Sequence, residues 1–158
     1  DKLDIKDLSI DINDCGEIDV PHRERWEFVQ SDDVGFGEQE FPRWCEGNGL
    51  SQQAKFIYID TSHLYEHTCK EIAVWSKHLA DGGVMVFHDT NMGKVYGRLD
   101  GSAGFGWDNQ RGVIRALEEF LGRSYDQNTF FTDIAGGYLV RHYPNCSGMT
   151  VLKKMGSK

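Results

Sequence analysis

The chain has 158 residues, of which 39% are hydrophobic, and its formal net charge is -8. This length suits one domain with a real core over residues 1–158. The acidic charge and the lack of a basic stripe argue against nucleic acid or an anionic membrane as the main partner. No run of about 18 apolar residues occurs, so no membrane-spanning helix is expected.

The four cysteines are scattered and lack the Cys-x-x-Cys spacing of a metal or redox site: Cys15, Cys45, Cys69 and Cys146. Scattered cysteines of this kind are typical of reduced thiols. Because such thiols persist in reducing compartments, we expect a cytoplasmic protein. The oligomeric state stays open, with a homo-oligomer as one option.

Two apolar runs near the N-terminus are predicted strands with acidic residues at their ends. Leu3–Ile12 includes the run LSIDI and ends near Asp11, and Trp26–Gln30 is followed shortly by Asp32. A carboxylate at a strand end can accept hydrogen bonds from the two hydroxyls of a ribose. From the residues alone, both acids can equally be solvated groups in surface turns.

Residues 55–90 are predicted to form a strand, a helix and a second strand. Lys55–Ile59 is an apolar run rich in β-branched and aromatic residues that ends at Asp60, and Val84–Phe87 ends at His88-Asp89. Two strands joined by a helix form a right-handed unit with parallel strands. Their carboxyl ends meet at the edge where open α/β sheets bind ligands.

The helix between these strands has predicted limits and a predicted inner face. Ser62 is the expected cap, and Asp81-Gly82-Gly83 is the expected stop because glycine adopts the left-handed backbone common at helix ends. The inner face follows a spacing of three and four residues: Tyr65, Cys69, Ile72, Trp75 and Leu79.

The stretch IDTSHLYEHT, followed by LADGGVMVFHDT, resembles the second half of a class I S-adenosylmethionine (SAM)-dependent methyltransferase. The likeness is greatest to the branch of cephalosporin-hydroxylase-like and small-molecule or sugar O-methyltransferases. Members often read I-D-G-D-H-x-Y-E after one strand and G-G-x-x-x-x-H-D at the next. This chain departs from that pattern at Thr61-Ser62, where Gly-Asp is common. It keeps the remaining motif residues: Asp60, His63, Tyr65, Glu66, Gly82, Gly83, His88 and Asp89.

The resemblance implies an α/β fold, a Rossmann-like methyltransferase sheet with an antiparallel last strand pair. It covers the C-terminal two-thirds of such a domain, so we expect the first strand and its glycine-rich SAM loop to precede residue 1. It also implies O-methylation of a small hydroxylated molecule, such as a sugar or a natural-product intermediate. By resemblance, SAM is held by Asp11 at the ribose, by Asp32 near the adenine and by Asp60.

The strand ends also carry candidate metal ligands and candidate bases. By resemblance, Asp60, His88 and Asp89 lie where related enzymes hold a divalent metal, Mg²⁺ or another ion. Carboxylates suit Mg²⁺, whereas a histidine ligand favours Mn²⁺, Fe²⁺ or Zn²⁺. His63 is the first candidate base and His88 the second, because the ordinary pKa of histidine lies near neutrality. The alternative is that the acids cap turns and the histidines hold loops.

The C-terminal third is predicted to hold a glycine-rich lid, a helix and two strands. Gly93–Gly112, which includes Trp107, is long and rich in glycine, as in a mobile lid over a substrate or an ordinary loop. Asn109 is the expected cap of a helix over Arg111–Leu121. Tyr138–Tyr143 and Met149–Lys154 are predicted strands.

Two other functions compete with methyl transfer. A binding module or fragment can keep the fold without binding the cofactor. A metal-dependent hydrolase is third, because His63-Leu64-Tyr65-Glu66-His67 spells the H-x-x-E-H pattern of a zinc peptidase. That motif requires His63 and His67 to share one helix face a turn apart.

Overall fold

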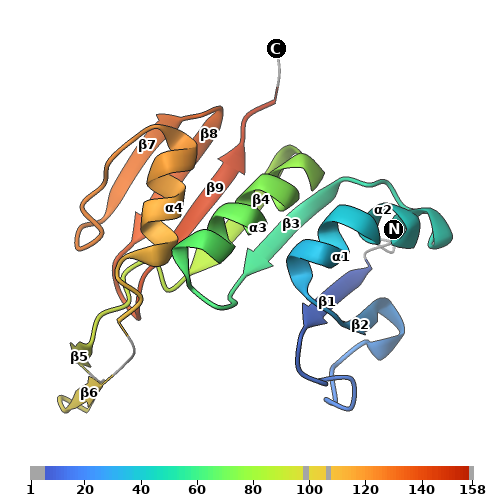
Figure 1. Cartoon of the computed structure of the whole chain (residues 1–158), viewed down its shortest axis with the longest axis horizontal. Coiled ribbons are helices and arrows are strands. Elements are labelled where there is room, and N and C mark those ends of the chain that lie inside the picture. The colour runs from blue at the N-terminus through green and yellow to red at the C-terminus, as the bar shows by residue number, and fades with distance from the viewer. Residues whose placement is uncertain (1–5, 98–99, 106–107, 157–158) are drawn as a thin grey trace. The chain divides into compact units, whose positions relative to one another are not determined.

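The computed structural model describes residues 6–97, 100–105 and 108–156. The chain divides into two compact units, Asp1–Gln52 and Gln53–Lys158 (Figure 1). Both units combine helices with strands, so the predicted α/β class is confirmed. None of the helices in the described part of the chain is long and apolar enough to cross a membrane.

The first unit is built on two parallel strands, β1 (Asp7–Asp11) and β2 (Trp26–Gln30). Their register pairs Asp7 with Trp26 and Asp11 with Gln30, so both strands end at the same edge. The predicted strand Trp26–Gln30 is confirmed, and the one predicted within Leu3–Ile12 is confirmed over Asp7–Asp11, while residues 3–5 lie outside the described part of the chain. The short helices of this unit are η1 (Arg23–Arg25), α1 (Asp33–Gln39) and α2 (Phe41–Gly47).

The second unit is built on a five-stranded sheet in the order β3-β4-β9-β8-β7. Strands β3 and β4 are parallel, and the remaining neighbours are antiparallel. The strands are β3 (Ala54–Ile59), β4 (Leu79–His88), β7 (Phe131–Ala135), β8 (Tyr138–Tyr143) and β9 (Met149–Lys154). The predicted bounds of β8 and β9 are confirmed, whereas β7 was not predicted.

Two helices, α3 (Tyr65–His78) and α4 (Gly112–Leu121), pack against each other and lie across one face of this sheet (Figure 1). Their apolar stripes bury against the central strands. The largest fully buried apolar side chains are Phe87, Ile72, Leu79, Met85, Ile114, Leu117, Leu152 and Val140. This core fixes the ends of β3 and β4, which carry the polar residues of the candidate site.

The predicted limits of α3 were wrong at both ends. Its N-cap is Leu64 rather than Ser62, because His63 adopts a left-handed backbone (φ 57°) that separates Ser62 from the helix. The helix ends at His78 and passes directly into β4. Gly82 (φ 72°) therefore serves a bulge in β4, where the register with β3 shifts, and not a helix stop.

The predicted inner face of α3 is confirmed in part. Ile72 and Trp75 are buried, whereas Tyr65 and Cys69 are half-buried. Leu79 is fully buried but begins β4. All four cysteines are free thiols.

The glycine-rich stretch contains a short antiparallel hairpin, β5 (Val95–Gly97) with β6 (Ala103–Phe105), which was not predicted. Trp107 lies outside the described residues. The lid itself stays a prediction. The expected cap of α4 was wrong: the N-cap is Arg111, and the side chain of Asn109 binds elsewhere.

Candidate functional site

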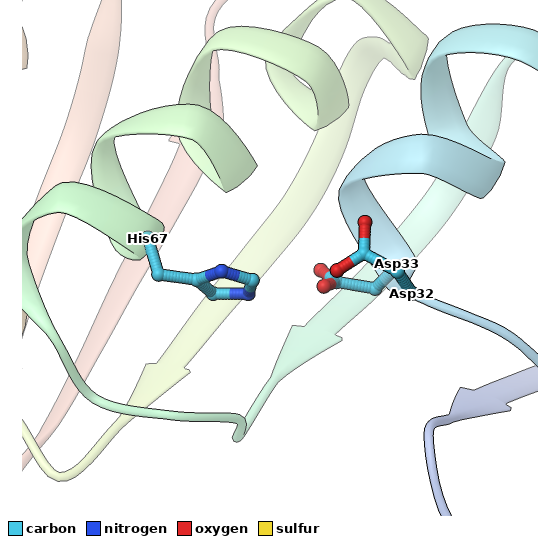
Figure 2. A group of neighbouring side chains, drawn as sticks. All are labelled: Asp32, Asp33 and His67. Carbon is cyan, nitrogen blue, oxygen red and sulfur yellow. The ribbon is translucent and has the colours of Figure 1, made fainter.

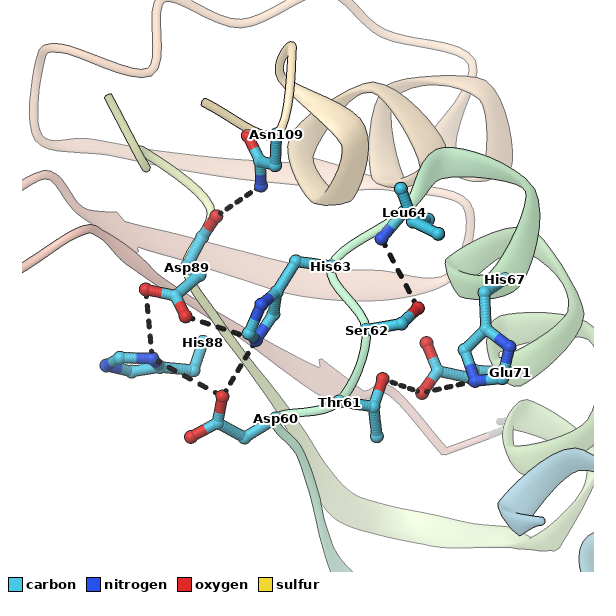
Figure 3. A network of polar contacts seen from close by, with 10 residues as sticks. All are labelled: Asp60, Thr61, Ser62, His63, Leu64, His67, Glu71, His88, Asp89 and Asn109. Atoms are coloured by element: carbon cyan, nitrogen blue, oxygen red, sulfur yellow. Dashed lines mark hydrogen bonds and ion pairs between the residues drawn. The ribbon is translucent and has the colours of Figure 1, made fainter. Parts of the chain in front are cut away.

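The candidate site lies where β3 and β4 end side by side. Ile59 pairs with Phe87, so the polar residues after each of them leave the sheet at the same edge. Asp60 follows β3, and Asp89 follows β4. Figure 3 shows their carboxylates turned toward the imidazole of His63.

The His63 ring joins the two carboxylates. Its Nε2 lies 2.9 Å from Asp60 Oδ1 and 3.1 Å from Asp89 Oδ2. These three groups lie close enough together to hold a metal ion. Asp89 is only 6% exposed, whereas Asp60 is exposed, so the site opens on the Asp60 side.

His88 lies at the rim of the same cluster. Its Nδ1 is 3.2 Å from Asp89 Oδ1 and 3.7 Å from Asp60 Oδ1. The sequence-based ligand set was Asp60, His88 and Asp89. The structure brings all three together. His63 Nε2 lies nearer than His88 Nδ1 to both carboxylates, at 2.9 Å rather than 3.7 Å from Asp60 and at 3.1 Å rather than 3.2 Å from Asp89.

Tyr58 is a site residue that sequence reasoning missed. Burial, the charges of Asp60 and Asp89, and a hydrogen bond to Asp60 together raise the pKa of its hydroxyl. Its ring also lies 6.5 Å from that of His88. The period of two along a strand would have revealed it, because Tyr58 and Asp60 project on the same side.

The segment after Asp89 is held by the turn between β8 and β9. Thr90 N donates to Gly148 O at 3.4 Å, and Asn91 N donates to Ser147 O at 2.6 Å. Gly148 has φ 84°, and a Cβ there would lie 2.4 Å from Asn91 N. Only glycine allows this close approach.

The zinc-peptidase alternative is contradicted by the structure. His63 precedes α3 in a left-handed conformation and contacts Asp60 and Asp89, so it does not share a helix face with His67. His67 instead lies 3.6 Å from Glu71, one turn along α3. Glu71 is fully buried and accepts a hydrogen bond from Thr61, so this second cluster ties the β3–α3 loop to the helix (Figure 3).

The first unit carries the two acids predicted to contact SAM. Asp11 Oδ1 accepts hydrogen bonds from the backbone and side-chain nitrogens of Asn13, at 2.7 and 3.0 Å. Asp32 caps α1 by accepting from Gly35 N at 2.7 Å, and Asp33 begins that helix (Figure 2). The cap alone explains an acid at position 32. Both SAM contacts stay predictions.

Comparison with known proteins supports the methyltransferase class. The model of a family described as a methyltransferase domain matches residues 13–90, which include Asp60, His63 and Asp89. A search of curated proteins found no match.

Solved structures support the fold. MycE, a methyltransferase from the mycinamycin biosynthetic pathway, solved with Mg, S-adenosylhomocysteine (SAH) and mycinamycin VI, aligns over 95% of this chain with a TM-score of 0.53 and 17% identity. A second crystal form of MycE with Mg and SAH gives a TM-score of 0.53, 95% coverage of this chain and 18% identity. At this identity the likeness shows the fold alone. The chain spans about a third, 36%, of the length of MycE.

Proposed function

We propose that the protein is a SAM-dependent O-methyltransferase that acts on a hydroxyl of a small molecule. The convergence of Asp60, His63 and Asp89 at the carboxyl ends of β3 and β4 carries this proposal. The family match adds support, because it includes these three residues. Methyl transfer needs a deprotonated acceptor oxygen. This cluster offers an imidazole that can take the proton and two carboxylates that can stabilise the resulting positive charge.

His63 is the proposed general base. Its Nε2 faces two carboxylates, which accept hydrogen bonds and cannot donate them when ionised. The neutral ring therefore carries its proton on Nε2 and offers Nδ1 to the acceptor hydroxyl. Once protonated, the imidazolium is stabilised by Asp60 and Asp89, in the way that a carboxylate supports a catalytic histidine.

The overall transfer balances without a further reactant. His63 would take the proton of the acceptor hydroxyl. SAM, when bound, would supply the methyl group to that oxygen, and its sulfur would keep the electron pair of the broken carbon–sulfur bond, so that the products would be the methyl ether and S-adenosylhomocysteine.

The site also fits a divalent metal, which we propose at the carboxylates of Asp60 and Asp89 with His88 as the neighbouring nitrogen ligand. His88 Nδ1 lies 3.7 Å from Asp60 Oδ1 and 3.2 Å from Asp89 Oδ1, and two carboxylates with an imidazole suit Mn²⁺ or Mg²⁺. A bound cation lowers the pKa of a coordinated hydroxyl. MycE was crystallised with Mg and S-adenosylhomocysteine, which supports the proposal that this protein binds both a divalent metal and SAM.

For SAM we propose Asp11 at the ribose, with Asp32 and Asp60 as further contacts. Asp11 Oδ1 is already engaged by Asn13, so a ribose hydroxyl would bind through Oδ2. The acceptor is proposed to be a hydroxylated natural product or sugar, because MycE is a methyltransferase of a natural-product pathway. The expected first strand with its SAM loop stays a prediction.

Titration of the complete domain with S-adenosylhomocysteine, followed by an assay of methyl transfer from labelled SAM to a panel of hydroxylated natural products, tests this proposal. We expect saturable binding and transfer to oxygen. A protein that binds no S-adenosylhomocysteine while retaining its fold would instead be a binding module.

A further inference from the structure

The turn that leads into α4, Asn109–Gly112, contacts two parts of the candidate site, the backbone of Asp89 and the loop that carries His63. It is closed by a hydrogen bond from Gly112 N to Asn109 O at 2.8 Å. Gln110 (φ 52°) and Arg111 (φ 61°) both adopt left-handed backbone, which is costly for residues other than glycine. Strain of this kind persists only where surrounding contacts hold it, so the turn has a fixed shape.

Asn109 holds the backbone of Asp89. Its Nδ2 donates a hydrogen bond of 3.1 Å to Asp89 O, from a side chain that is 5% exposed (Figure 3). Asp89 itself adopts a left-handed backbone (φ 55°), so its carbonyl needs such a partner to stay in place. Because a carbonyl only accepts, the amide orientation of Asn109 is fixed by this bond.

The same side chain carries a cost to stability. Asn109 Oδ1 is buried and has no hydrogen-bond partner among the described residues. A buried acceptor without a partner destabilises the fold. Stability alone therefore does not explain an asparagine at this position, whereas the hold on Asp89 does.

Gly112 lets the turn press against His63. A Cβ at Gly112 would lie 2.4 Å from His63 O and 2.9 Å from Tyr65 N, both backbone atoms that cannot move aside easily. Gly112 is buried. Glycine at this position therefore allows the closest approach of α4 to the loop that carries His63.

We propose that Asn109 is a positioning residue, which sets Asp89 against His63 while Gly112, three residues later in the same turn, supports the His63 loop. This inference rests on the proposed function only for its turnover readout. The Asn109–Gly112 turn is the last part of the segment that joins β4 to α4. That segment is therefore connected directly to Asp89 and to the His63 loop.

The variant Asn109→Leu tests the proposal, since leucine has a similar shape and no donor. The matched control is Asn91→Leu, because Asn91 Nδ2 makes the same kind of bond, 3.1 Å to Pro144 O, without contacting Asp89. Calorimetry with Mn²⁺ should show affinity at least about tenfold weaker in Asn109→Leu, as for other residues that orient a ligand. Turnover should fall with it, while the melting temperature stays within about 4 °C of wild type. Equal losses of affinity in both variants, or none in either, would overturn the proposal.

A second measurement needs neither metal nor cofactor. In metal-free protein, the Nε2 proton of His63 should give a slowly exchanging NMR resonance, because two carboxylates hold it. We expect Asn109→Leu and Gly112→Ala to lose or shift this resonance and Asn91→Leu to keep it. An unchanged resonance in Asn109→Leu, or none in wild type, contradicts the positioning role. If wild type shows the resonance but binds no Mn²⁺, the metal in the proposed function is refuted. The role of Asn109 is then decided by the effect of Asn109→Leu on this resonance alone.

Discussion

His63 Nε2 lies 3.1 Å from Asp89 Oδ2, although the two residues follow different strands. Both have a left-handed backbone, with φ of 57° and 55°. Non-glycine residues in this conformation are strained, and such strain clusters at functional sites. The contact therefore joins two residues whose strained backbone destabilises the fold locally and holds the His63 ring against the Asp89 carboxylate.

The roles of the two histidines can be separated by substitution. His63→Ala should lower turnover by about 10²–10⁴-fold, the usual contribution of a general base, while Mn²⁺ still binds. His88→Ala should weaken Mn²⁺ binding instead, because His88 borders both carboxylates. Calorimetry and turnover on both variants decide. Loss of the metal from His63→Ala would make His63 a ligand rather than the base.

Much of the second unit follows from local sequence patterns. The runs that form β8 and β9 are apolar, and their limits were predicted correctly. Strand β7 was missed because its alternate residues face solvent, with Ile134 60% exposed, so it lacks a continuous apolar run. The start of α3 was misplaced because nothing in the sequence signals the left-handed backbone of His63.

The candidate site was predictable only where it follows strand ends. Asp60, His63, His88 and Asp89 could be named because parallel strands bring their carboxyl ends to one edge. Asn109 could not, because its contact with Asp89 joins segments that are distant in the chain. Such contacts depend on how α4 packs, which no local pattern encodes.

Gly148 should be intolerant of any side chain. Gly148→Ala places a Cβ 2.4 Å from Asn91 N on a backbone with φ 84°. The left-handed backbone alone should cost about 1–3 kcal/mol of unfolding free energy, and the clash adds to it. Urea unfolding measures this. Gly93→Ala is the control, because its nearest neighbour would be 3.7 Å away. Equal stability of the two variants would contradict the tight packing behind Asp89.

His142 should make the protein less stable in mild acid. It is fully buried, its Nε2 donates to Gln127 O at 2.8 Å, and its Nδ1 accepts from Thr150 Oγ1 at 2.8 Å. Burial lowers its pKa, opposed by the bond to Gln127 and by the charge of Asp126. The unfolded chain, with an ordinary pKa of about 6.5, therefore binds the proton first as the pH falls.

The free energy of unfolding is therefore highest above about pH 6.5. Below that pH it declines by at most about 1.4 kcal/mol per pH unit, until the pH reaches the lowered pKa of His142. Denaturation curves between pH 7 and 5 should show this slope in wild type and a shallower one in His142→Gln. The exposed His22→Gln serves as control and should keep the wild-type slope. A slope that His142→Gln leaves unchanged would exclude His142 as its source.

Asp11→Ala should weaken binding of S-adenosylhomocysteine by about 1.5–3 kcal/mol, the usual value of hydrogen bonds to a charged group. Asp7→Ala is the control, because Asp7 is also exposed but lies at the opposite end of β1. Calorimetry on both variants of the complete domain makes the comparison. Unchanged affinity in Asp11→Ala would remove this carboxylate from the cofactor site.

The most direct test of the metal site is methyl transfer from SAM by the complete domain, measured with and without excess chelator on wild type and Asp89→Asn. The amide keeps the shape of Asp89 and removes its charge, so metal affinity and turnover should fall together, by at least about tenfold, while S-adenosylhomocysteine still binds. Asp81→Asn, which changes an exposed acid near the start of β4, should behave as wild type. We predict that chelator abolishes turnover in wild type. Full activity in excess chelator, with Asp89→Asn as active as wild type, would contradict a metal-assisted site at Asp60 and Asp89.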